Sequence, residues 1–122
     1  MSELVAQSGS HTKVGTPKEA ISASEVILEA IPFGLVPRLP LAQLKGEILL
    51  SASNYFPGRD GTIDMKGLTQ TAWMSTQLPE VIMVKTFSMM GAAVLNRHAD
   101  GDKGKNYAIF LAGNDSEAKH GF

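Results

Sequence analysis

The chain has 122 residues, of which 43% are apolar and 19% charged, and its formal net charge is −1. This length is enough for one compact core and too short for two, so we expect residues 1–122 to form a single domain. The near-neutral charge argues against nucleic acid as a partner, because proteins that bind polyanions carry an excess of basic residues.

Other classes of protein are excluded by residue content. There is no cysteine, so disulfides, thiolate chemistry and zinc–thiolate sites are absent and the cytoplasm is the expected compartment. No apolar run approaches the roughly 20 residues that span a bilayer, and we expect no membrane association. The histidines His11, His98 and His120 lie in polar or terminal sequence without a metal partner at helical or turn spacing, so no metal site is predicted.

The first predicted helix is marked by its N-terminal residues. Thr16 is a plausible N-cap, Pro17 occupies the first helical position and Glu19 the third, which is the spacing of a capping box. The apolar residues 25–31 (EVILEAI) follow, and Pro32 and Gly34 end them, as is typical of a buried strand.

Three more apolar runs repeat this pattern, at residues 47–53, 81–87 and 107–112. Helical patterns separate them. These are a short turn or helix around Leu39, Leu41 and Leu44, helices over residues 68–78 and 89–97, and a last helix over residues 116–120 with Asn114 and Asp115 as caps. The glycine-rich, charged residues 57–67 and 99–105, which include Asp100, are expected to be loops. Alternating strands and helices predict an α/β fold with a parallel sheet and crossover helices.

Ligands of an open parallel sheet bind beyond the carboxyl ends of the strands, where the turns 31–34, 53–61 and 87–91 are expected to lie. The Asn54 amide can donate and accept at once, which suits a carboxamide or a ribose edge. Ser88 is expected to precede a helix start, where main-chain N–H groups favour an anion or a carbonyl oxygen. Each feature has a structural alternative, since Asn54 and Ser88 could equally be caps and residues 31–34 a simple turn.

No residues form an acid–base or nucleophile arrangement, so no catalytic residue is predicted. Arg59, Asp60 and Asp64 lie in the glycine-rich loop, where charged side chains are usually solvated. If the chain belongs to an enzyme, its reaction should depend on placement more than on protein proton transfer. Hydride transfer between two bound cofactors meets that description.

The segments EVILEAIPFGLVPRL, GEILLSASNYFPGRDG, VIMVKTFSMMGAAVLN and FLAGNDSEAK resemble, in this order, the family of deazaflavin-dependent NADP reductases and related dinucleotide-binding oxidoreductases. The resemblance implies a Rossmann domain that binds NADP(H) and passes hydride to or from a deazaflavin or similar acceptor. It implies that Ile31, Pro32 and Phe33 lie along the dinucleotide and that Asn54 lies near the nicotinamide. It also implies that the turn over residues 85–90 faces the acceptor, through Thr86, Phe87, Ser88 and Met89.

The sequence departs from the family in three ways. Family members begin with a strand and a GxGxxG-type turn, whereas the only early glycines here are Gly9 and Gly15, so we expect a partial Rossmann fold lacking the first β-α-β unit. Glu29 stands where the family has an apolar strand residue, and a buried unpaired carboxylate would be costly. Ser88 stands where asparagine is common.

Without the first two strands of the usual order, residues 25–31 would form a sheet edge that invites pairing. We expect a homodimer, a complementing chain that supplies the unit, or a changed position of residues 12–14. The second hypothesis for function is therefore a non-catalytic binding or assembly module that pairs through this edge.

Overall fold

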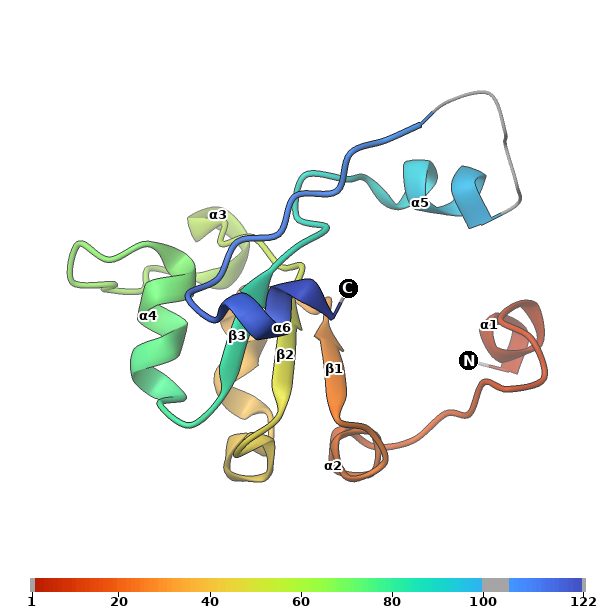
Figure 1. Ribbon diagram of the computed structural model, residues 1–122, viewed down its shortest axis with the longest axis horizontal. Helices are drawn as coiled ribbons and strands as arrows, with labels where there is room; N and C mark the ends of the chain where they lie inside the picture. Colours follow the sequence, from red (N-terminus) through yellow and green to blue (C-terminus); the bar gives the residue numbers. More distant parts are fainter. Residues whose placement is uncertain (1, 100–105, 122) are drawn as a thin grey trace.

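The computed structural model describes residues 2–99 and 106–121. At its centre lie three parallel strands, β1 (Val26–Glu29), β2 (Ile48–Ser51) and β3 (Ile82–Lys85), hydrogen-bonded in the order β1-β2-β3 (Figure 1). Parallel neighbours need a crossover between them, and each crossover here contains helices. The chain therefore has the α/β fold that its alternating pattern predicts.

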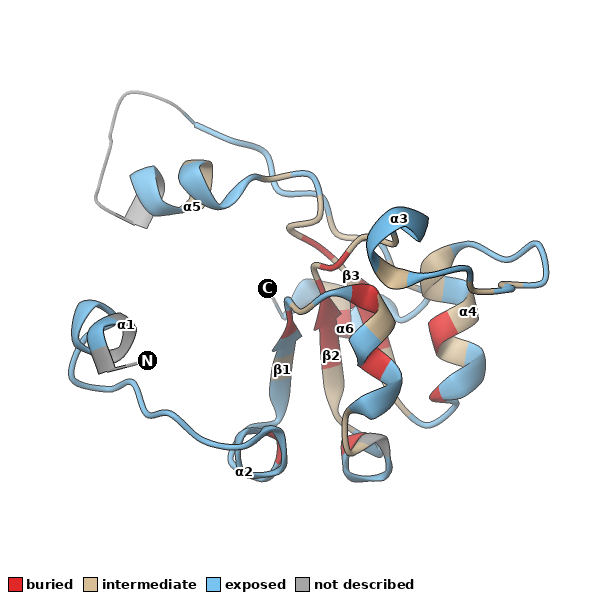
Figure 2. Ribbon diagram, turned by 180° about the vertical axis from the view of Figure 1, so that it is seen from behind, coloured by how far each residue is buried: buried red, intermediate tan, exposed pale blue. Residues whose placement is uncertain are grey.

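The helices surround this sheet in chain order. They are α1 (Ser2–Gln7), α2 (Pro17–Ser22), the 3₁₀ helices η1 (Phe33–Arg38) and η2 (Leu41–Leu44), α3 (Pro57–Asp60), α4 (Gln70–Gln77), α5 (Ala92–Ala99) and α6 (Ser116–His120). The first crossover consists of η1 and η2, and the second of α3 and α4. In both ribbon views α1 and α5 lie away from the sheet (Figures 1 and 2).

Local sequence signals explain several helix starts. At α2 the Thr16 hydroxyl accepts from the Glu19 N–H at 3.3 Å, while the Glu19 carboxylate accepts from the Thr16 N–H at 2.7 Å, which completes the predicted capping box. The Asp115 carboxylate caps α6 by accepting from the Ala118 N–H at 2.8 Å. Thr69 caps α4 in the same way, through Ala72.

The two faces of the sheet are covered unequally. The larger core lies under η1, η2, α2 and α4 and consists of Ile21, Phe33, Val36, Leu44, Leu49, Met74, Leu78 and Met83. On the other face α6 buries Ala118 against Leu50 and Val84. Figure 2 shows the buried residues concentrated on β2, β3 and the neighbouring helix faces. Within the described chain, β1 is an edge strand and its Val26 and Leu28 are exposed.

The predicted fourth strand is wrong. Only Ala112 of residues 107–112 pairs with the sheet, through one antiparallel bridge to Lys85 with N···O distances of 2.7 and 3.0 Å. Tyr107, Ile109 and Phe110 are exposed. An apolar run shows that a segment can form a strand, but the strand also needs a partner edge, and here the main chain meets β3 at one residue.

Three other expectations need correction. The helix expected from residue 89 begins at Ala92, so Ser88 does not start it and His98 lies in a helix rather than a loop. Residues 57–60, expected to be part of a loop, form the single turn α3. Asp100 lies outside the described residues. None of the helices in the described part of the chain has the length and apolarity that crossing a bilayer requires.

Candidate functional site

The carboxyl ends of all three strands open into one hollow of about 610 Å³. Its walls come from the three turns that the sequence places beyond the strands, together with the end of β1 and the beginning of α5. The lining residues are Leu28, Ala30, Ile31, Pro32, Ala52, Ser53, Asn54, Phe56, Arg59, Phe87, Ser88, Met90, Ala92 and Leu95. Turns distant in the sequence thus form a single concave surface.

A second hollow of about 620 Å³ has a different position. It runs along β3 between α4 and residues 112–115, and it contains no residue from the ends of β1 or β2. Ligands of open parallel sheets bind at the strand ends rather than beside an edge strand. The hollow at the strand ends is therefore the stronger candidate site.

Asn54 joins two of the turns. Its Nδ2 donates a hydrogen bond to the main-chain oxygen of Ser88 at 2.8 Å, which ties the end of β2 to the end of β3. The main-chain oxygen of Asn54 accepts a hydrogen bond from Nη2 of Arg59 at 2.6 Å. The Asn54 Oδ1 has no hydrogen-bond partner among the described residues. This leaves one amide acceptor in the hollow available to a ligand.

Asp60 links the turn after β1 to the turn after β2. Its side chain is only 1% exposed and accepts from Arg59 Nε at 2.8 Å, Arg59 Nη2 at 2.8 Å and the Phe56 N–H at 2.9 Å. The Arg59 hydrogen bond holds the pKa of Asp60 well below its usual range against the opposing effect of desolvation, and the main chain of Phe56 and Gly34 adds to the lowering. The expectation that Asp60 is solvated is thus wrong, whereas Asp64 is exposed as expected.

Gly34 packs directly on this residue. A Cβ atom added at Gly34 would lie 3.0 Å from the Asp60 main-chain oxygen and 3.1 Å from its Cα. The glycine therefore lets η1 approach α3 closely. This contact fixes the turn after β1 against the turn after β2.

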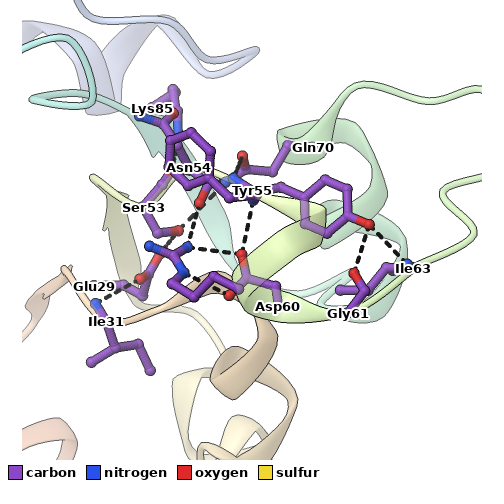
Figure 3. Close-up of polar contacts among 12 residues, drawn as sticks. Glu29, Ile31, Ser53, Asn54, Tyr55, Asp60, Gly61, Ile63, Gln70 and Lys85 are labelled. Carbon is purple, nitrogen blue, oxygen red and sulfur yellow. Dashed lines mark hydrogen bonds and ion pairs between the residues drawn. The ribbon is translucent and has the colours of Figure 1, made fainter.

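A polar network lies beneath the hollow and explains Glu29 (Figure 3). The Glu29 carboxylate, 3% exposed, accepts from Ser51 Oγ at 3.0 Å, Ser53 Oγ at 2.7 Å and the Ile31 N–H at 3.1 Å. The cost expected for an unpaired buried carboxylate is avoided, because the strand after Glu29 and the neighbouring strand supply donors. The side chain holds the ends of β1 and β2 together.

The main-chain oxygen of Ser53 is the next part of this network. It accepts from Gln70 Nε2 at 2.9 Å and from Lys85 Nζ, so α4 and β3 are joined to the end of β2 (Figure 3). Burial lowers the pKa of Lys85, and the Glu29 charge partly opposes that shift. The amine is thus held at the strand ends, outside the hollow that Asn54 lines.

The structure brings together five of the eight predicted binding residues. Those that line the hollow are Ile31, Pro32, Asn54, Phe87 and Ser88. Their binding roles stay predictions. Phe87 has a φ of 56°, an uncommon left-handed conformation for an aromatic residue, in the turn after β3.

The other three predicted residues lie elsewhere. Phe33 is fully buried in the larger core, with its ring centroid 5.7 Å from that of Tyr55 and 5.6 Å from that of Trp73. Thr86 is buried, and its Oγ1 has no partner within the described chain. Met89 is 83% exposed and lines a separate, smaller hollow with residues 108–110. Consecutive residues of a turn point in different directions, so a segment-wide assignment cannot separate lining residues from core residues.

Arg59 is the site residue that sequence reasoning missed. A lone arginine in a glycine-rich loop resembles a solvated charge, and its position depends on Asp60, which lies on the same short helix. The adjacent arginine and aspartate, immediately after a strand end, were the signal available in the sequence.

Comparison with known proteins supports the fold. A candidate F420-dependent NADP reductase from Arthrobacter sp. FB24 matches with a TM-score of 0.70 and 19% identity over 88% of this chain. A hypothetical protein from Sinorhizobium meliloti matches with a TM-score of 0.67 and 32% identity over 86% of this chain. This chain spans 52% of the length of each of those structures. No family model and no curated protein matches the sequence. The chain therefore has a Rossmann-like α/β fold similar to roughly half of these larger proteins.

Proposed function

We propose that this chain is the cofactor-facing part of an NADP(H)-dependent oxidoreductase that transfers hydride between NADP(H) and a deazaflavin or similar acceptor. The observation that carries the proposal is the convergence of three strand-end turns on one hollow, with Asn54 joining two of them. Its volume of about 610 Å³ is within the range of small-molecule sites. The fold shared with the Arthrobacter protein, which is described as acting on these cofactors, favours the same class of reaction.

The residues present fit one end of a dinucleotide. Pro32 and Ile31 give an apolar wall, and Asn54 Oδ1 gives an acceptor for a carboxamide N–H. NADP(H) would supply or accept the hydride, while the chain holds the ring in place and excludes water. The 122 residues contain no GxGxxG turn, so we propose that they bind dinucleotide weakly by themselves.

Isothermal titration with NADPH tests the proposal. We expect saturable binding that Asn54→Ala weakens by about tenfold, because a hydrogen-bonded group in the hollow is removed. Lys45→Ala is the matched control, since Lys45 is exposed, pairs with Glu80 and precedes the opposite end of the strands. An assay with a deazaflavin acceptor then tests hydride transfer. A wild-type chain that binds no NADPH at millimolar concentration would refute the proposal.

A second candidate function is supported by β1. Its outer edge has no neighbouring strand in the described chain, and Val26 and Leu28 are exposed on it. Unpaired strand edges add strands from other chains. We propose as the alternative a non-catalytic assembly module that pairs through β1, either with a second copy or with a complementing chain. A mass that rises with concentration in the absence of nucleotide would favour it.

A further inference from the structure

The charge of the hollow at the strand ends comes from one side chain. Among the described residues that line it, Arg59 is the only one with an ionisable group. The remaining lining is apolar apart from Ser53, Asn54 and Ser88. A single cation on an otherwise uncharged wall selects ligands that carry a negative group at that point.

The guanidinium of Arg59 is held in one orientation. Its Nε and Nη2 donate to the two carboxylate oxygens of Asp60 at 2.8 Å each, and Nη2 also donates to the Asn54 main-chain oxygen at 2.6 Å. The guanidinium carbon lies 5.1 Å from the centre of the Phe56 ring. Because these contacts already restrict the side chain, a ligand would lose little affinity to ordering it.

One edge of the guanidinium is still available. The Arg59 side chain is 44% exposed, whereas Asp60 is 1% exposed, so the carboxylate is shielded and the guanidinium faces solvent. The Nη1 atom has no hydrogen-bond partner in the part of the chain that the structure describes. Its two N–H groups can therefore donate to an incoming oxyanion.

We infer that Arg59 recognises a phosphate group of the ligand bound in this hollow. The inference deepens the proposed function and rests on it, because a dinucleotide carries phosphate next to the ribose of its nicotinamide. A planar guanidinium with a free N–H edge suits a phosphate oxygen better than a lysine amine does. The phosphate belongs either to the nucleotide or to a phosphorylated acceptor, and the two sources are separable by experiment.

Four probes are titrated into the wild-type chain and into Arg59→Gln. They are reduced nicotinamide mononucleotide, reduced nicotinamide riboside without phosphate, a deazaflavin carrying a phosphate ester, and the same deazaflavin without it. We expect Arg59→Gln to weaken binding of a phosphate-bearing probe by about 10- to 100-fold and to leave the phosphate-free partner unchanged. Loss confined to the mononucleotide assigns the phosphate to the nucleotide, and loss confined to the deazaflavin ester assigns it to the acceptor.

The control is Lys66→Gln, since Lys66 is exposed, pairs with Asp64 and does not line the hollow. Arg59→Lys keeps the charge and is expected to recover part of the affinity if Arg59→Gln folds poorly. Inorganic phosphate should also compete with the mononucleotide on the wild-type chain but not with the riboside. Equal affinities of both Arg59 variants and the wild type for every phosphate-bearing probe would overturn the inference alone. A wild-type chain that binds none of the four probes would overturn the proposed function as well.

Discussion

Individual residues at the strand ends hold the site together through buried polar contacts, and Glu29 is the clearest case. Its carboxylate receives donors from Ser51, Ser53 and the Ile31 main chain. Glu29→Leu should lower the free energy of unfolding by about 2–4 kcal/mol, because two buried hydroxyls lose their acceptor. Combining it with Ser51→Ala and Ser53→Ala should restore part of that loss, since the unpaired hydroxyls are then gone. Urea denaturation measures both effects.

The matched control for Glu29 is Glu25→Leu. Glu25 is exposed just before the same strand, so its free energy of unfolding should change by less than about 0.5 kcal/mol. If the triple variant were as unstable as Glu29→Leu alone, the unpaired hydroxyls would not be the cause of the loss.

Asp60 should make stability depend on acid. Its folded pKa lies below the unfolded value because Arg59 donates to the carboxylate. Its contribution is therefore fully present above the ordinary aspartate pKa of about 3.9 and is lost as the pH falls through the folded pKa. Unfolding measured from pH 7 to pH 2 should show a steeper decline for the wild type than for Asp60→Asn. Parallel curves for the two proteins would show that the pair contributes nothing to the acid dependence.

At this scale the sequence predicts some roles and misses others. The position of Asn54 after a strand is visible in the order of residues, because strand ends are marked by local signals. The burial of Asp60 is not visible there, since it depends on Gly34 packing against α3 from a different crossover. Phe33 was assigned to the dinucleotide because it follows Pro32, yet its ring turns into the core.

Elements with complete local signals agree best with the sequence. The capping box of α2 and the Asp115 cap of α6 need only residues within one helical turn, and both are confirmed. The apolar runs that became β1, β2 and β3 are each buried on at least one face by covering helices. Residues 107–112 have the same apolar pattern, but only Ala112 reaches β3, and local sequence cannot report whether an edge is within reach.

Gly113 tests how this last segment docks. An added Cβ would lie 2.8 Å from the Met83 main-chain oxygen, closer than packed atoms tolerate. Gly113→Ala should therefore push the segment off β3 and lower the free energy of unfolding by about 1–3 kcal/mol. Gly58→Ala is the control, because no atom lies within 4 Å of its added Cβ and alanine favours the helix α3. Hydrogen exchange at the Ala112 amide should rise only in Gly113→Ala, and equal protection in both variants would contradict the predicted docking.

The whole molecule is a three-stranded sheet whose two edges differ. β3 is partly covered by the bridge to Ala112, whereas β1 has no strand beside it in the described chain. The parallel order and the common hollow follow from the alternation of strands and helices, which is why they could be predicted. What pairs with β1 could not be predicted, because strand partners are chosen by segments far apart or on other chains.

If β1 pairs with another copy, a charge on its exposed side should prevent association. Val26→Lys places an amine on this edge, where lysine blocks strand addition, and the variant should stay monomeric while its unfolding midpoint is unchanged. Leu68→Lys is a matched control, because Leu68 is 43% exposed against 39% for Val26 but precedes α4, away from β1. Sedimentation velocity over a hundredfold range of concentration should show self-association for the wild type and for Leu68→Lys only. A wild-type chain that is monomeric over the whole range would rule out self-pairing and leave a complementing chain as the partner to seek.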